Sequence, residues 1–170
     1  MPSVLKYRNN FPQIHPSVFL ADGSRVIGDV EIGADSSIWF NAVVRGDIRF
    51  IRIGSRTNIQ DNCTVHVTTA THETIIGNSV TVGHRAILHG CTVHDDVLIG
   101  MGSIVMDGAV VHSLSLVAAG ALVPPGMVVP EGMLVAGVPA KIIRPLRQQE
   151  RDNILFSATH YCDIVKGYRA

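Results

Sequence analysis

Residues 93–129 read VHDDVLIGMGSIVMDGAVVHSLSLVAAGALVPPGMVV, and this stretch decides the fold. A branched apolar residue returns at every sixth position, which is neither the two-residue alternation of a half-buried strand nor the spacing of a helix. A six-residue period indicates a solenoid in which three short faces make one triangular coil and the coils stack. The residues on this beat are Val93, Ile99, Val105, Val111, Val117, Val123 and Val129.

The same beat continues on both sides of this stretch. Glycine often follows the apolar position, as at Gly33, Gly54 and Gly77, where a bare backbone can make a tight corner. We therefore predict an all-β fold, a left-handed parallel β-helix of hexapeptide repeats over residues 11–143. A sandwich of short strands is the alternative, but its strands alternate with a period of two. The further positions on the beat are Ile14, Leu20, Val26, Ile32, Ile38, Val44, Ile53, Ile59, Val65, Ile76, Val82, Leu88 and Val135.

The pattern changes at the C-terminal end of the chain. The segment AGVPAKIIRP is expected to close the solenoid, and from Leu146 the apolar residues follow a helical spacing. This spacing predicts a C-terminal capping α-helix over 146–166, packed along the solenoid by Ile154, Ala158, Tyr161 and Val165. A length of 170 residues fits one domain, so we expect residues 1–170 to form a single domain.

Composition excludes several classes of partner. The 14 Lys and Arg residues balance 14 Asp and Glu residues, which leaves no basic surface for nucleic acid or an acidic membrane. No apolar segment resembles a signal peptide or a membrane span. The three cysteines lack the spacing of a metal site and do not suggest a disulfide framework. We expect a cytoplasmic protein with no nucleic-acid or membrane partner.

The beat breaks at three places, and these breaks are where function is expected. Val44 and Ile53 are nine residues apart, Val65 and Ile76 eleven, and Leu88 and Val93 five. When each interval counts as one face, Val44, Val65 and Leu88 share a face in three successive coils, and about five residues of VTTATHET loop out. If the eleven-residue interval held two faces instead, the residues after Val65 and Leu88 would separate.

Polar residues follow these core positions and form two expected columns. Arg45, His66 and His89 stand in one column, and Asp61 lies beneath His84 on the adjacent face. Coils stack about 4.8 Å apart, so His66 and His89 can reach one metal ion. His84 lies around a corner, so an adjacent copy would supply it, and three copies around a threefold axis would share three sites. Surface or hydrogen-bonding roles are expected for the other histidines, His15, His72, His94, His112 and His160.

Three motifs carry a family resemblance. RGD at 45–47, TNIQDN at 57–62 and GHRAILHGC at 83–91 together closely resemble the gamma-class carbonic anhydrase family of hexapeptide proteins. The resemblance covers nearly the whole chain. It implies a homotrimer with an interfacial metal ion held by His66 and His89 of one subunit and His84 of the next. Zinc is the expected ion, and iron or cobalt would also suit three imidazoles.

The resemblance also implies roles for polar neighbours of the metal. Arg45 and Asp61 would form an ion pair across the subunit contact, with a purely structural salt bridge as the equal alternative. Gln60 would hydrogen-bond a metal-bound hydroxide. Asp47 and Asn58 would line the pocket, Asn58 on the substrate side, and Tyr161 would be a further catalytic neighbour.

These residues imply reversible hydration of carbon dioxide to bicarbonate by a metal-bound hydroxide. One departure concerns proton transfer, because Ile48 follows Asp47 and the looped segment offers only His72 and Glu73 as carriers. Two alternatives remain. AGVPAKIIR resembles the closing coil of hexapeptide acyltransferases, which suggests acyl transfer or thioester hydrolysis on an acyl-CoA. The metal could also hold together a trimeric binding protein without catalysis.

Overall fold

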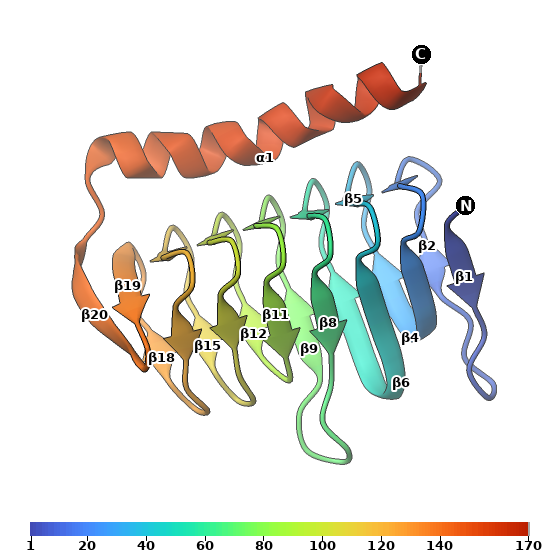
Figure 1. Ribbon diagram of the computed structural model, residues 1–170, viewed down its shortest axis with the longest axis horizontal. Helices are drawn as coiled ribbons and strands as arrows, with labels where there is room; N and C mark the ends of the chain where they lie inside the picture. Colours follow the sequence, from blue (N-terminus) through green and yellow to red (C-terminus); the bar gives the residue numbers. More distant parts are fainter. Residues whose placement is uncertain (170) are drawn as a thin grey trace.

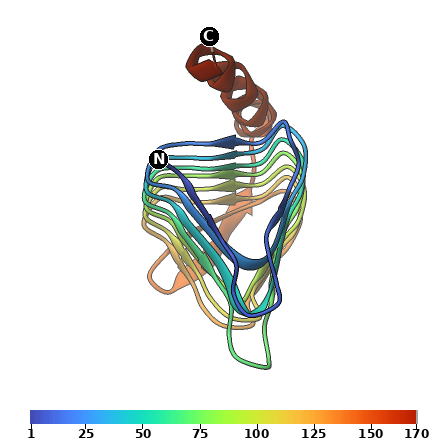
Figure 2. The same ribbon diagram turned by 90° about the vertical axis from the view of Figure 1, so that its right-hand side faces the viewer.

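The computed structural model describes residues 1–169, which form a left-handed parallel β-helix with one α-helix alongside (Figure 1). Seen down its axis, the solenoid has a triangular cross-section with three flat faces (Figure 2). The first face holds β1 (Ser3–Leu5), β8 (Thr64–His66), β11 (Ile87–His89), β14 (Ile104–Val105) and β17 (Leu122–Val123). The second face holds β2 (Gln13–Ile14), β9 (Thr74–Ile76), β12 (Thr92–Val93), β15 (Val110–Val111) and β18 (Val128–Val129).

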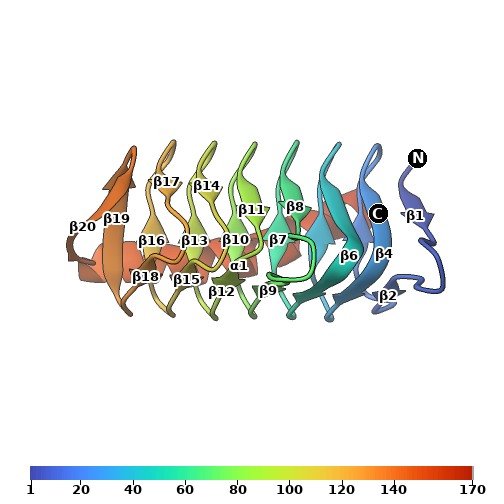
Figure 3. The ribbon, with the colours of Figure 1, turned by 90° about the horizontal axis from the view of Figure 1, so that it is seen from below.

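Two long strands connect these faces, and a second sheet forms the third face. Strands β4 (Arg25–Ile32) and β6 (Val43–Ile53) contribute to both the first and the second face. The third face holds β3 (Phe19–Leu20), β5 (Ser37–Ile38), β7 (Asn58–Ile59), β10 (Thr81–Val82), β13 (Leu98–Ile99), β16 (Leu116–Val117), β19 (Met133–Gly137) and β20 (Ala140–Pro145). Seen from below, the coils follow one another as a regular ladder (Figure 3).

The core is a stack of aliphatic residues placed by the six-residue beat. Val44 pairs in register with Val65, Val65 with Leu88, and Leu88 with Val105, all in parallel strands. These four side chains are fully buried. Burial of each such side chain contributes roughly 1.5–3 kcal/mol, and only stacking of coils provides it. The sandwich alternative is therefore wrong, because three faces surround this core and their strands pair in parallel, except in the β19–β20 hairpin.

The three breaks in the beat lie where the one-face count places them. Strand β6 bulges against β4, with a register shift between Gly28 and Val30. Ile76 pairs with Ile53 below it and with Val93 above it, so the interval from Val65 to Ile76 is one face. The extra residues of that interval protrude as a loop between β8 and β9, closed by a bridge between Thr68 and His72 (Figure 1).

The corner glycines allow successive coils to approach each other closely. A Cβ atom on Gly54 would lie 2.6 Å from the carbonyl carbon of Gly77 in the next coil. Gly54 does not have a positive φ, whereas non-glycine corner residues such as Asp35 and Asn62 do. Gly54 and Gly77 therefore do not use the positive φ that glycine allows. Their lack of a side chain lets successive corners stack.

Helix α1 (Gln148–Arg169) lies along the third face and caps it (Figures 1 and 2). Ile154, Ala158 and Val165 are its buried residues, and the Tyr161 ring meets Trp39 edge-on at 5.4 Å. Glu150 caps the first turn of the helix, because its carboxylate accepts a hydrogen bond from the Arg147 N–H at 2.8 Å, as in a capping box. The helix therefore starts at 148 and continues to 169, whereas the apolar spacing indicated 146–166.

The ends of the solenoid differ from its middle. β1 pairs with β4 through Val4 and Val26, so coiling begins before residue 11, where the beat gave no sign of it. At the other end β19 and β20 form an antiparallel hairpin, as AGVPAKIIRP suggested. All three cysteines are free. Among residues 1–169 no helix is long and apolar enough to cross a membrane.

Candidate metal centre

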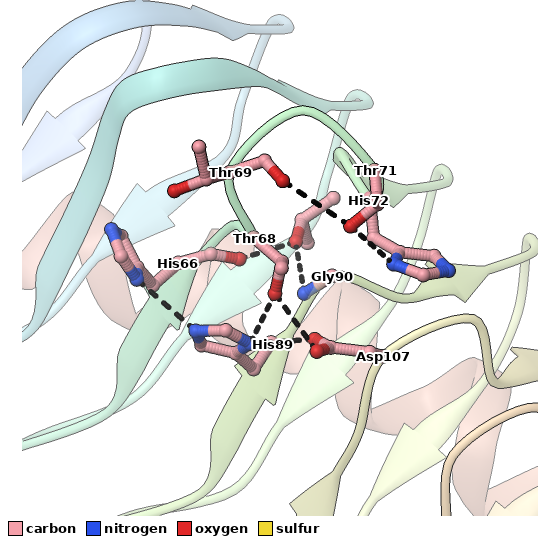
Figure 4. A network of polar contacts seen from close by, with 9 residues as sticks. His66, Thr68, Thr69, Thr71, His72, His89, Gly90 and Asp107 are labelled. Carbon is pink, nitrogen blue, oxygen red and sulfur yellow. Dashed lines mark hydrogen bonds and ion pairs between the residues drawn. The ribbon is translucent and has the colours of Figure 1, made fainter.

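Two histidines face each other where the first face of the solenoid turns into the second. His66 ends β8 and His89 ends β11, and the two residues are partners in register. His66 Nδ1 lies 3.2 Å from His89 Nε2, with ring centroids 5.1 Å apart (Figure 4). The expected column of His66 and His89 is confirmed, because the eleven-residue interval forms a single face.

The spacing of these nitrogens fits a shared metal ion. Two ligands on a tetrahedral zinc ion, with bonds of about 2.0–2.1 Å, lie roughly 3.3 Å apart. The observed separation of 3.2 Å is close to this value. His66 and His89 can therefore hold one divalent cation as neighbouring ligands without moving far from their positions in the structure.

A carboxylate supports His66 from behind. His66 Nε2 lies 3.0 Å from Asp47 Oδ1, and Arg45 forms an ion pair with the same carboxylate. Burial opposes ionisation of Asp47, but hydrogen bonds from His66 and Arg45 outweigh it and lower the pKa of Asp47. Burial also lowers the pKa of His66, which favours the neutral ring that a metal needs. An ionised Asp47 assigns the proton to Nε2 and leaves the Nδ1 lone pair toward His89.

A second carboxylate, which the sequence did not single out, contacts His89. Asp107 Oδ1 lies 2.6 Å from His89 Nδ1, and Asp107 Oδ2 accepts a hydrogen bond from Thr68 at 2.8 Å (Figure 4). Asp107 comes two residues after Val105, the partner of Leu88 in the next coil. This register was available from the six-residue beat, and it is the signal that could have found Asp107.

His84 lies at the opposite corner of the first face. It follows β10, and its Nδ1 lies 2.6 Å from Asp61 Oδ2, one coil below, as the second column predicted. A turn at His84 and Arg85 and the strand β11 separate His84 from His89, which ends that strand. Among residues 1–169 of one chain, no three His, Cys, Asp or Glu side chains form a metal site. The structure thus pairs His66 with His89 and leaves His84 apart.

Polar residues expected in the pocket cluster around His84. Gln60 Oε1 accepts the backbone N–H of His84 at 3.2 Å, and Gln60 Nε2 donates to Asn58 Oδ1 at 3.1 Å. Asn58 Nδ2 in turn donates to Thr81 Oγ1 at 3.0 Å. Gln60 and Asn58 are both buried. These hydrogen bonds hold the backbone at His84 in place. They connect it to Thr81 on the third face and do not reach His66.

A groove of about 380 Å³ opens beside His84, between α1 and the third face. Gln60, His84 and Tyr161 line its polar end, and aliphatic residues of β13 and β16 line the rest. Burial, together with the negative charge of Asp61, raises the pKa of Tyr161. Tyr161 therefore stays a neutral hydroxyl that can donate a hydrogen bond into this groove.

The ion pair between Arg45 and Asp61 is expected across a subunit contact, and one chain alone does not form it. Within the chain, Arg45 pairs with Asp47 and Asp61 pairs with His84. Glu73 in the protruding loop is bound to Arg49 Nε at 2.9 Å. A single copy therefore contains two separate polar clusters, one around His66 and one around His84.

Comparison with known proteins gives consistent matches. The family model described as bacterial transferase hexapeptide (six repeats) matches residues 11–46. Gamma carbonic anhydrase 1, mitochondrial, of Arabidopsis thaliana is 46% identical over 164 residues, which are 94% of this chain and 60% of the plant protein. The chain thus spans about 60% of the length of that relative.

Two further matches cover nearly all of both proteins. Carbonic anhydrase of Geobacillus kaustophilus is 45% identical over 167 residues, which are 98% of this chain and 91% of that protein. The crystal structure of a hexapeptide transferase family protein from Anaplasma phagocytophilum superposes with a TM-score of 0.93 at 43% identity, and the match covers 97% of each chain.

Proposed function

The chain belongs to the gamma carbonic anhydrase family, and from that membership we propose that it catalyses the reversible hydration of carbon dioxide to bicarbonate with a divalent metal ion. His66 and His89 of one subunit and His84 of the next would hold the ion. One observation carries this proposal: the ring nitrogens of His66 and His89 face each other at 3.2 Å, with a carboxylate behind each ring.

The proposed assembly is a homotrimer. Two imidazoles from one chain leave the metal short of the three protein ligands that catalytic sites generally use. His84 has a half-exposed side chain, 42% accessible, at the other end of the first face. Rotation about a threefold axis that places one copy's His84 against another copy's His66 and His89 generates three equivalent sites.

His66, His89 and the neighbouring copy's His84 would hold a divalent ion, which when bound would lower the pKa of water to near 7 and so make hydroxide available at neutral pH. Three neutral imidazoles suit zinc, and iron or cobalt fit the same ligands. Gln60 and Asn58 provide amides beside His84 to orient carbon dioxide and water. Arg45 and Asp61, which contact Asp47 and His84 within one chain, would pair with each other across the subunit contact. Since Arg49 holds Glu73, His72 is the proposed proton carrier to buffer.

Acyl transfer or thioester hydrolysis on an acyl-CoA is the second candidate. The observation that favours it is the groove beside His84, which is mostly aliphatic and could hold a pantetheine or acyl chain. A single general base suffices for such chemistry, so it leaves the facing pair of His66 and His89 without a purpose. This difference makes carbon dioxide hydration the better supported activity.

The test compares metal content and hydration in two histidine variants. We expect His89→Ala to lose its metal and to reduce hydration at least about 100-fold, because one ligand and its carboxylate support are removed. His112→Ala, which changes a histidine stacked only on His94, should keep both. Elemental analysis and a stopped-flow hydration assay measure these quantities.

Other outcomes would redirect the assignment. Acetyl-CoA turnover without carbon dioxide hydration would favour the acyltransferase. Full metal occupancy with hydration at the level of a buffer blank, and dissociation of the trimer on chelation, would indicate a non-catalytic metal-stabilised protein. Unchanged metal content in His89→Ala would reject the proposed ligand set.

A further inference from the structure

We propose that Asp107 is a positioning residue for His89. Asp107 fixes the His89 ring so that Nε2 faces His66, and it connects this ring to the protruding loop through Thr68. The inference rests on the proposed function in one respect, which is that the positioned His89 nitrogen is there to bind a metal ion. The contacts themselves involve Asp107, His89 and Thr68 of one chain (Figure 4).

The first step is the tautomer of His89. Asp107 Oδ1 lies 2.6 Å from His89 Nδ1. An ionised carboxylate only accepts hydrogen bonds, so Nδ1 carries the proton. In a neutral imidazole the other nitrogen then presents its lone pair, and Nε2 is the atom that lies 3.2 Å from His66 Nδ1. Asp107 thus selects which nitrogen of His89 is available to a cation.

The second step is the link to the loop between β8 and β9. Thr68 Oγ1 donates to Asp107 Oδ2 at 2.8 Å and lies 3.3 Å from His89 Nδ1. The Thr68 N–H donates to the carbonyl of His72 at 2.9 Å, which closes the loop. The two oxygens of Asp107 therefore have separate partners, one on the ring and one on the loop.

The third step is the space that this carboxylate occupies. A Cβ atom on Gly90 would lie 2.5 Å from Asp107 Oδ1 and 2.8 Å from His72 Cβ. Gly90 also has a φ of +57°, which suits glycine. Its bare backbone leaves room for both Asp107 and His72 beside Gly90. The loop, the carboxylate and the ring therefore pack as one unit.

The closing experiment reads the His89 tautomer in metal-free protein by long-range ¹H–¹⁵N NMR near pH 8.5, where a free imidazole is neutral. Wild type should show the Nδ1-protonated form of His89. In Asp107→Ala the Nε2-protonated form should become populated. In Thr68→Val the tautomer should remain, while the backbone amide at position 68 exchanges faster with solvent. Asp163→Ala, which removes an exposed carboxylate bound to Lys166 on α1, is the control.

Metal binding provides the second measurement. Loss of a carboxylate behind a histidine ligand generally weakens metal affinity 10- to 100-fold, and we expect a zinc dissociation constant raised by about that factor in Asp107→Ala. Asp107→Leu has a side chain of similar shape that cannot accept a hydrogen bond, so it serves if the alanine variant does not fold. An unchanged His89 tautomer in the folded variant would overturn the inference. The tautomer is read without metal or carbon dioxide, so a shifted tautomer in a protein with no hydration activity would reject only the proposed function.

Discussion

At the scale of single residues, the geometry of the His66–His89 pair depends on the carboxylates behind the two rings. Asp47 and Asp107 each hold the outer nitrogen of one ring, which leaves the inner nitrogens of His66 and His89 facing each other. Gly90 makes this arrangement possible by leaving space for Asp107. A small change at Gly90 should therefore disturb the site more than its position in a corner suggests.

Gly90→Ala tests this dependence against Gly102→Ala. Both glycines have positive φ, +57° and +66°, so either alanine costs about 1–2 kcal/mol of backbone strain. Only Gly90 has Asp107 and His72 within contact of the new methyl group, whereas nothing lies within 4 Å at Gly102. We expect Gly90→Ala to lose about 1–3 kcal/mol more in free energy of unfolding, measured by urea denaturation. Equal losses in the two variants would show that the space above Gly90 is not needed.

At the scale of elements, α1 is attached to the solenoid by a narrow stripe. Ile154, Ala158 and Val165 are buried, and Tyr161 and Tyr168 pack their rings on Trp39. Most of the remaining helix residues are polar or exposed, including Phe156 at 65% accessibility. Because Tyr161 and the third face form the groove beside His84, the position of this helix also shapes the proposed site.

Ile154→Ala should weaken the attachment of the helix. Truncation of a fully buried isoleucine costs about 2–5 kcal/mol, since it loses apolar burial and leaves a cavity. Phe156→Ala, on the exposed side of the same helix, should cost less than about 0.5 kcal/mol. Trp39 is the only tryptophan and contacts the helix, so its emission during urea unfolding reports the change. A loss in Phe156→Ala as large as in Ile154→Ala would place a partner on the outer face of the helix.

At the scale of the whole molecule, the proposed ligands are divided between two corners of the triangle. His84 lies where the third face passes into the first, and His66 and His89 lie where the first passes into the second. The rigid strands between them prevent these corners from meeting within one copy. In the proposed site, one corner would therefore come from each of two subunits.

Subunit mixing tests this division. His84→Ala and His66→Ala should each be inactive alone. Equal amounts, unfolded and refolded together, should recover about one quarter of wild-type hydration, because a quarter of random contacts join an intact His66 with an intact His84. The stopped-flow assay measures the recovery. Mixing His66→Ala with His89→Ala should restore nothing, since each of those subunits has a damaged pair. No recovery in the first mixture would mean that all three histidines act within one subunit.

The sequence by itself determined the solenoid and the register of its coils. A six-residue beat is a local property, and each strand can be assigned by counting from the last. The same counting placed His89 on His66 and His84 on Asp61, which the strand pairing confirms.

The tertiary structure alone decided the contacts between side chains of different coils. Asp107 meets His89 across 18 residues of chain, and Thr68 meets Asp107 across 39. The direction of those side chains depends on corner conformation and on space left by Gly90. Counting gives the coil and the face of each residue, but hydrogen bonds form only where oriented groups come within about 3 Å. For that reason the pairing of Arg45 with Asp47, the support of His89 by Asp107 and the close approach of the corner glycines were visible only in the folded chain.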